Sequence, residues 1–338
     1  MSENHDSQVD VGPLKSTVIS RYGAWIAAAA VVLAVGGGLV AAGLVPSPIA
    51  GNVANSANAA SSAGDASADW RARWTTTGLG ADRVTPPNGA AAAFATARVK
   101  HVGDVNDLLA GFVAAGKLSA VDPRGRRRYD VYDAGTLFAA LTAGKAEPVH
   151  SLEAAWLARG LCDLVGPGCS FVELTTAVPT PLLLTRSLFA VEIGGVRLAH
   201  LPPSDGATPA AVGVALDDAG AVAQWLVLRA HVARARGEFT AAHADLAAAD
   251  TIKPGAPATA FARGVLQIEQ GLRDQGVASC LAALERADDP MARLFLADVF
   301  SATERPFKAF EMVEAVVQRF PDLAEGHVAQ GMLRAGRV

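Results

Sequence analysis

The stretch LRAHVARARGEFTAAHADLAAAD, residues 228–250, sets a pattern that returns every 33 or 34 residues as far as Val338. A small residue recurs at Ala230, Gly264, Ala297 and Gly331. A second small residue follows each of the first three by twelve positions, at Ala242, Gly276 and Ala309. A side chain of core size comes four residues later, at Leu246, Cys280 and Val313. Because several positions keep the same interval together, we interpret the period as a structural repeat.

A repeat of this length with helical apolar spacing predicts two antiparallel helices in each unit. Each pair of helices is too small to bury its apolar face alone, so neighbouring pairs must stack. Close helix crossings need Gly or Ala where the backbones approach, which accounts for the recurring small residues. Gly237 and Gly271 fall where the first helix of a unit turns into the second. Pro254 and Pro321 end second helices, because proline cannot continue a helix beyond its first turn.

This segment resembles the tetratricopeptide repeat (TPR) family, whose units run small residue, aromatic, Ala, bulky residue and Pro over 34 residues. The resemblance covers residues 217–338 and departs from the family where the late aromatic of the first helix is Ala233 and Gln267. It implies an α-helical solenoid whose first helices line a concave groove for a peptide or partner protein. The implied groove residues are Val227, His231, Arg234, Phe261, Val265, Ile268, Glu269, Leu294 and Asp298. The alternative is that the units bury this face on the rest of the protein.

The N-terminal region predicts a membrane anchor. Residues 1–21 read as a disordered cytoplasmic tail, and residues 22–46 as a transmembrane helix, because residues 24–45 hold no charge and can span a bilayer. Lys15 and Arg21 precede the span, whereas no Lys or Arg follows it before Arg71, which places the C-terminal bulk in the periplasm or otherwise outside the cytoplasm. The alternative is a signal peptide cleaved near residues 57–59.

Two further features concern the anchor and the segment after it. Small residues at four-residue spacing in the span could pair two anchors as a dimer; they are Ala30, Ala34, Gly38 and Ala42. Residues 47–68 are rich in Ala and Ser and predict a flexible linker. The sequence therefore indicates a single-pass protein of the inner (cytoplasmic) membrane of a bacterial envelope.

Residues 69–216 predict a small α+β domain, with helices first and strands after. Asp104, Asp133 and Ser151 are the expected caps of three successive helices, the first running from Gly103 to Ala120. SFVELTT, residues 170–176, reads as a strand, and residues 186–201 read as a hairpin turning at Gly194 and Gly195. The hairpin register predicts that Val191 faces Leu198, Ile193 faces Val196 and Glu192 faces Arg197. The whole chain is therefore expected to be mainly α.

The order of helix, strand and hairpin faintly resembles transglutaminase-like and papain-like domains. That family implies a catalytic Cys at the start of a helix such as SLEAAWLARGL and a His on the following strand. This chain has His150 and Ser151 where the Cys would stand, and Leu188 near the position of the His. The resemblance therefore implies a domain that has lost the chemistry. An enzyme or pseudoenzyme with substrate-positioning repeats remains the alternative function.

Other chemistry-bearing residues give no catalytic, metal or cofactor site. Cys162 and Cys169 flank a short loop that a disulfide could close in an oxidising compartment, and Cys280 reads as a buried apolar residue. The net charge of −4 argues against nucleic-acid binding, which needs a strongly basic face. The function expected from the sequence is that of a membrane-anchored scaffold, in which the repeats bind a partner protein.

Overall fold

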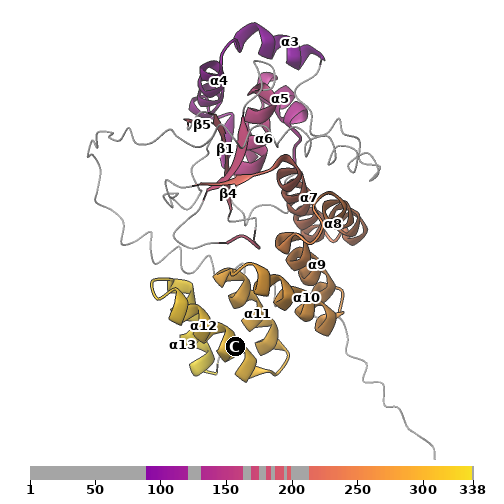
Figure 1. Ribbon diagram of the computed structural model, residues 1–338, viewed down its shortest axis with the longest axis vertical. Coiled ribbons are helices and arrows are strands. Elements are labelled where there is room, and N and C mark those ends of the chain that lie inside the picture. The colour runs from indigo at the N-terminus through magenta and orange to yellow at the C-terminus, as the bar shows by residue number, and fades with distance from the viewer. Residues whose placement is uncertain are drawn as a thin grey trace, which may run out of the picture.

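The C-terminal period is present as seven consecutive helices in a computed structural model of the chain (Figure 1). They are α7 (Asp218–Ala235), α8 (Phe239–Ile252), α9 (Pro257–Glu269), α10 (Arg273–Arg286), α11 (Pro290–Ala302), α12 (Pro306–Arg319) and α13 (Ala324–Arg334). The structure describes residues 89–336 except for gaps at 121–130, 163–168, 175–179, 184–186, 194–195 and 199–212. Within these residues the protein is mainly α, with a small α+β middle region and a C-terminal array of paired helices consistent with a helical repeat.

The turns inside the helix pairs lie at the positions that the sequence predicts. Gly237 has a backbone φ of 78° between α7 and α8, and Gly271 has a φ of 88° between α9 and α10. Glycine suits these turns because a Cβ disfavours the left-handed region. The third pair uses Glu304 at the equivalent position, with a φ of 57°. The chain thus keeps the same turn in three units, although the third unit lacks the glycine.

Two of the recurring small residues, Gly264 and Gly276, lie where a pair of helices crosses. A Cβ added to Gly264 on α9 would come within 2.5 Å of the Cys280 Sγ and 2.7 Å of the Gly276 carbonyl oxygen on α10. A Cβ added to Gly276 would come within 2.5 Å of the Gly264 carbonyl oxygen. Backbone atoms therefore occupy the space that a larger residue would need. Close approach of α9 and α10 depends on these two glycines.

The middle region begins with four helices and a pair of very short strands. The helices are α3 (Gly89–Arg98), α4 (Val102–Ala114), α5 (Ala134–Thr142) and α6 (Ser151–Cys162). Strands β1 (Leu118–Ala120) and β2 (Glu147–Val149) pair in parallel. The sequence pattern predicts neither strand. The helix expected to run from Gly103 to Ala120 ends at Ala114, so that expectation was wrong. A strand of three residues is too short to show period-two alternation, so its pairing rests on tertiary contacts.

A four-stranded antiparallel sheet completes the middle region. It contains β3 (Ser170–Leu174), β4 (Leu188–Ile193), β5 (Val196–Leu198) and β6 (Gly213–Leu216), in the spatial order β5-β4-β3-β6. Pairing of Val191 with Leu198, Glu192 with Arg197 and Ile193 with Val196 confirms the predicted hairpin register. β6 leads almost directly into α7, so the sheet is joined to the helical array by one residue, Asp217.

The helix caps differ in part from those expected. The Asp133 carboxylate accepts a hydrogen bond from the Thr136 amide, which confirms its role as a cap. Asp104 lies inside the first turn of α4 instead of before it, and its carboxylate accepts from the amides of Lys100 and His101. Ser151 is already helical, so the expectation that it caps α6 was wrong. His150 takes that place, and its Nδ1 accepts from the Leu152 amide at 3.1 Å.

The core runs across the boundary predicted at residues 216 and 217. One buried cluster joins Trp156 and Phe171 of the middle region to Trp225 and Leu246 of α7 and α8. The Trp225 indole also donates to the Tyr132 carbonyl oxygen at 3.2 Å. A second buried cluster lies among α9 to α13 and includes Leu182 from the middle region. The first helix pair and part of α9 therefore share a core with the middle region, while α9 to α13 and Leu182 form a second one.

The predicted tail, anchor and linker lie outside the described residues, as does the turn at Gly194 and Gly195. None of the helices within the described ranges is both long enough and apolar enough to cross a membrane.

Candidate functional site

The nine residues expected to line a groove lie on α7, α9 and α11, the first helices of their pairs. They separate into two sets by exposure. The apolar set is buried and comprises Val227, Phe261, Val265, Ile268 and Leu294. The polar set is half-buried and comprises His231, Arg234, Glu269 and Asp298. The interpretation of the apolar residues as an open groove centre therefore needs correction, since Phe261 is only 1% exposed. In this conformation a partner could reach the polar set but not the apolar one.

A segment of the middle region contributes to covering the apolar set. Thr180–Leu183 belongs to neither a helix nor a strand, and lies between β3 and β4 in the sequence. Leu182 is 2% exposed and belongs to the same buried cluster as Phe261, Val265 and Leu294. Leu183 packs against that cluster and is partly buried. Part of the apolar set therefore shares a buried cluster with the middle region.

The Asp289 side chain binds the backbone of this segment. One carboxylate oxygen, Oδ2, accepts hydrogen bonds from the Leu182 amide at 3.0 Å and the Leu183 amide at 3.2 Å. The other, Oδ1, accepts from the Ala292 amide at 2.9 Å and so caps α11. The side chain is fully buried, so both oxygens serve the protein interior. Asp289 is absent from the residues that the sequence singled out, although an Asp directly before Pro290 is a strong signal for the start of a helix.

The pKa of the Asp289 carboxyl group is higher than that of an ordinary aspartate. Burial raises this pKa above the ordinary value for Asp, and the amides of Ala292, Leu182 and Leu183 lower it only in part. Burial also raises the pKa of Glu173 on β3, which is lowered in part by hydrogen bonds from Ser187 and Gln224. The negative charge of Asp289 raises the pKa of Glu173 further. The negative charges of the Asp289 and Glu173 carboxylates therefore repel one another where the middle region meets the helical array.

Three residues of the polar set, His231, Arg234 and Glu269, form a network. Arg234 on α7 makes an ion pair with Glu269 on α9, and its guanidinium lies 3.1 Å from Nδ1 of His231. This pair links two successive units of the array. Asp298 on α11 lies apart from the network and has no hydrogen-bonding partner within the described ranges. Burial raises the pKa of Asp298 to about 7, so its charge changes near neutral pH.

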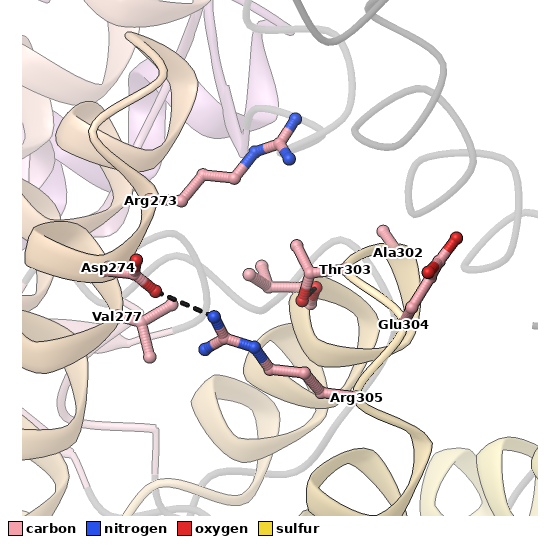
Figure 2. A pocket seen from close by; sticks show the side chains of 8 residues that line it. Arg273, Asp274, Val277, Ala302, Thr303, Glu304 and Arg305 are labelled. Atoms are coloured by element: carbon pink, nitrogen blue, oxygen red, sulfur yellow. Dashed lines mark hydrogen bonds and ion pairs between the residues drawn. The ribbon is translucent and has the colours of Figure 1, made fainter. Parts of the chain in front are cut away.

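A pocket of about 370 Å³ lies at the turn edge of the array, between α10 and the turn from α11 to α12 (Figure 2). It is lined by Arg273, Asp274, Val277, Val299, Ala302, Thr303, Glu304 and Arg305. Arg305 makes an exposed ion pair with Asp274 at 3.0 Å, whereas Arg273 extends away from that pair. The pocket has charges of both signs and broad access to solvent, so it offers no strong preference for one ligand.

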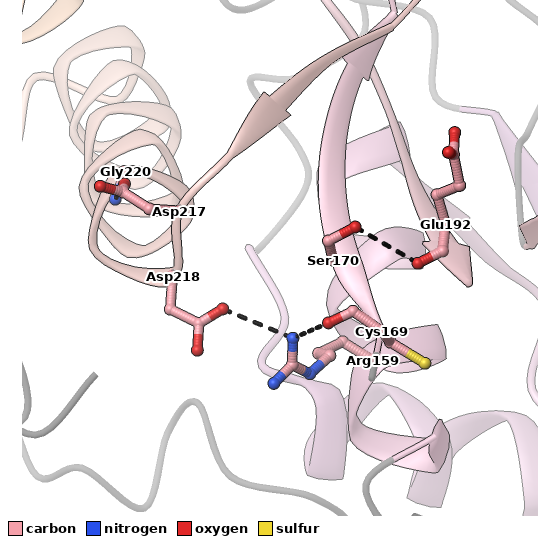
Figure 3. Close-up of polar contacts among 7 residues, drawn as sticks. All are labelled: Arg159, Cys169, Ser170, Glu192, Asp217, Asp218 and Gly220. Atoms are coloured by element: carbon pink, nitrogen blue, oxygen red, sulfur yellow. Dashed lines mark hydrogen bonds and ion pairs between the residues drawn. The ribbon is translucent and has the colours of Figure 1, made fainter. Parts of the chain in front are cut away.

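A polar junction fixes α7 against the middle region (Figure 3). The Arg159 guanidinium on α6 donates to the Cys169 carbonyl oxygen and lies 3.4 Å from the Asp218 carboxylate at the start of α7. Asp217 caps α7 by accepting from the Gly220 amide at 2.7 Å. These contacts orient the first helix pair relative to the sheet, and so place the later pairs near Thr180–Leu183.

The residues that stand where a transglutaminase-like nucleophile would lie are engaged in structural hydrogen bonds. The Ser151 hydroxyl donates to the Ser187 carbonyl oxygen at 3.3 Å and accepts from the Phe189 amide at 3.1 Å. It thereby ties the start of α6 to β4. The Glu153 carboxylate accepts from the His150 amide at 2.8 Å and from the Tyr132 amide at 2.6 Å. This arrangement fixes the start of α6.

The cysteines and histidines add no metal centre among the described residues, where no group of three or more His, Cys, Asp and Glu could hold an ion. Cys162 and Cys169 are buried thiols in the structure, and their pairing on oxidation stays a prediction. Cys280 is also buried, as its position in the repeat suggests, and burial raises the pKa of its thiol to about 12. His243 contacts Gln270 through its Nε2, while His231 contacts Arg234.

Comparisons of the chain with protein-family models, with curated proteins and with solved structures find no match.

Proposed function

We propose that the chain is a membrane-anchored adaptor whose C-terminal repeats, of the TPR type, bind a partner protein outside the cytoplasm. One observation carries the proposal: the face formed by α9 and α11 holds a short bent segment, Thr180–Leu183, through a buried leucine and two backbone amides. A face that binds one short segment through its amides and a leucine side chain has the groups to bind another of the same kind. The half-buried polar residues beside it supply charges for selecting a partner.

Two features support the TPR assignment over a generic helical array. The turns at Gly237 and Gly271 and the crossing at Gly264 and Gly276 keep the family's spacing. Small residues at these positions let the two helices of a pair approach closely, and such pairs stack with their first helices on one face. The engagement of Ser151 in backbone hydrogen bonds supports a structural role for the middle region, which would position the array instead of carrying out catalysis.

Partner binding is tested by reversing one charge on the candidate face. The full chain is purified in detergent and used to capture proteins from solubilised envelopes, as wild type, Asp298→Arg and Glu314→Arg. Glu314 is exposed on α12, a second helix, so its variant makes the same charge change away from the face. A partner should be captured by wild type and Glu314→Arg and be lost with Asp298→Arg. Equal capture by all three folded proteins would refute the proposal.

The membrane topology is tested separately with cysteines in the predicted tail and linker. A Ser62→Cys variant should react with a membrane-impermeant maleimide applied to intact spheroplasts, and a Ser7→Cys variant should not. The labelled protein should remain in the membrane fraction, because an uncleaved anchor retains it. Reaction of Ser7→Cys, or release of the labelled protein as a soluble form, would contradict the proposed topology.

A further inference from the structure

The contacts at Thr180–Leu183 bear on what kind of partner the repeats bind. Resting on the proposed function, we infer that Thr180–Leu183 is a built-in ligand of the α9–α11 face. The partner that replaces it is then a leucine-containing peptide that takes up the same bent backbone and is recognised through two consecutive amides. The structure thus assigns both the occupant of the face in the free protein and the chemistry of its competitor.

The recognition combines one side chain with the main chain. Leu182 enters a buried apolar cluster with Phe261 and Leu294, which selects a branched aliphatic side chain. The amides of Leu182 and Leu183 both donate to the Asp289 Oδ2, which any residue other than proline could satisfy. A peptide with a leucine followed by a second non-proline residue meets both requirements. Recognition by the main chain makes the face tolerant of the flanking side chains.

The same segment is joined to the middle region by a short chain of hydrogen bonds. The Thr180 carbonyl oxygen accepts from the Ser187 hydroxyl at 3.1 Å, and the Ser187 carbonyl oxygen accepts from the Ser151 hydroxyl at 3.3 Å. Release of the segment would therefore disturb the hydrogen bonds that Ser187 and Ser151 make at the start of α6. This link gives the middle region a means of responding to partner binding.

Leaving the face is less costly for this segment than for a strand or helix. Its amide bonds to Asp289 are made with a side chain, so release breaks no sheet or helix ladder. The α11 cap from Asp289 to Ala292 remains in place after release. What release does expose is the part of the buried apolar cluster that Leu182 covers, and an incoming leucine would cover that surface again. Exchange of one leucine segment for another therefore conserves most of the stabilising contacts.

The inference is tested with a fluorescently labelled peptide of residues 178–186, VPTPLLLTR, added to the full chain in detergent. The wild type holds its own copy at an effective concentration in the millimolar range, which competes with added peptide. A Leu182→Ala variant, which weakens the internal copy, should bind the peptide about 10- to 100-fold more tightly than wild type. A Leu182→Asp variant should show the same gain, provided that circular dichroism shows it folded.

Two controls assign the binding to this face. The peptide with its own leucine replaced, VPTPDLLTR, should not bind the Leu182→Ala variant. Adding Asp289→Asn to Leu182→Ala should abolish peptide binding, because the asparagine oxygen can still cap α11 while its amide group opposes the peptide amides. Equal peptide affinity for wild type and Leu182→Ala, or binding that survives Asp289→Asn, would overturn the inference.

The inference and the proposed function can fail separately. If neither the wild type nor the Leu182→Ala variant binds the peptide and envelope capture still depends on Asp298, the built-in ligand inference is wrong and the adaptor function stands. If the peptide binds as expected and capture is unaffected by Asp298→Arg, the segment is an internal ligand and the adaptor proposal is wrong.

Discussion

The packing of the repeats makes a quantitative prediction at two glycines that occupy the same position in different units. Gly264 on α9 and Gly331 on α13 are each the first small residue of their repeat unit. A Cβ at Gly264 would meet Cys280 and Gly276, whereas a Cβ at Gly331 would meet nothing within 4 Å. Gly264→Ala and Gly331→Ala therefore add the same methyl group to a helix, one at a crossing and one in open space.

The distances set the size of the effect. The new methyl at Gly264 would lie 2.5 Å from the Cys280 Sγ, well inside the 3.4 Å at which ordinary contact begins. Two of the three nearest atoms belong to the α10 backbone, so no rotamer change relieves the clash. Overpacking of this kind costs about 3 kcal/mol, against a gain of about 1 kcal/mol from helix propensity. Gly331→Ala keeps only the gain.

The assay is thermal denaturation of the full chain followed by circular dichroism. With a change of about 2–4 °C per kcal/mol for a protein of this size, Gly264→Ala should lower the midpoint by about 4–8 °C. Gly331→Ala should raise it by about 2–4 °C. A double variant, Gly264→Ala with Cys280→Ala, should recover part of the loss because it removes the Sγ. An equal rise in both single variants would refute the close crossing of α9 and α10.

Three further predictions concern a turn, a carboxyl group and a hydroxyl group. Glu304→Gly should raise the free energy of unfolding by about 0.5–1 kcal/mol in denaturant titration, because Glu304 has a φ of 57° where Gly271 has 88°; a loss of stability would contradict this. Burial raises the pKa of Asp298 in the folded state, so the folded protein binds this proton more tightly than the unfolded chain does. The stability that the bound proton contributes is present below about pH 4 and is lost as the pH rises through about 7. Asp298→Asn should therefore be more stable than wild type at pH 8, by roughly 1–3 kcal/mol, and no more stable at pH 4; a difference that does not change with pH would count against it. Ser151→Ala should lower the midpoint of thermal denaturation by an amount equivalent to about 1–3 kcal/mol, because the buried Phe189 amide loses its acceptor; an unchanged midpoint would show that the hydroxyl is not structural.

The sequence predicts most of the helical array because its signals are local. Gly237 and Gly271 mark turns by a backbone conformation that other residues disfavour, and Gly264 marks a crossing by its lack of a side chain. The β4–β5 hairpin is likewise predictable, since alternation around a short turn fixes which residues face each other. Such features depend on residues that lie within a few positions of one another.

The parts that the sequence does not predict depend on distant contacts. Leu182 follows a proline in a segment without periodicity, and its burial comes from residues about a hundred positions later in the chain. Phe261 reads as a groove residue because its helix position faces inward, whereas in the structure it is buried in a cluster that contains α10, α11 and Leu182 side chains and packs against Phe295. Asp289 was recognisable as a cap from Pro290, but the two further amides that it binds were not.

The seating of Leu182 and Leu183 against Asp289 is central to the proposed binding face, and amide hydrogen exchange at those two leucines tests it most directly. Exchange is measured by mass spectrometry on the full chain in detergent, as wild type and as Asp289→Asn. The wild type should protect both amides, and Asp289→Asn should lose that protection while α11 stays protected. Exchange of both amides in the wild type at the rate of an unfolded peptide would contradict this seating and the binding face built on it.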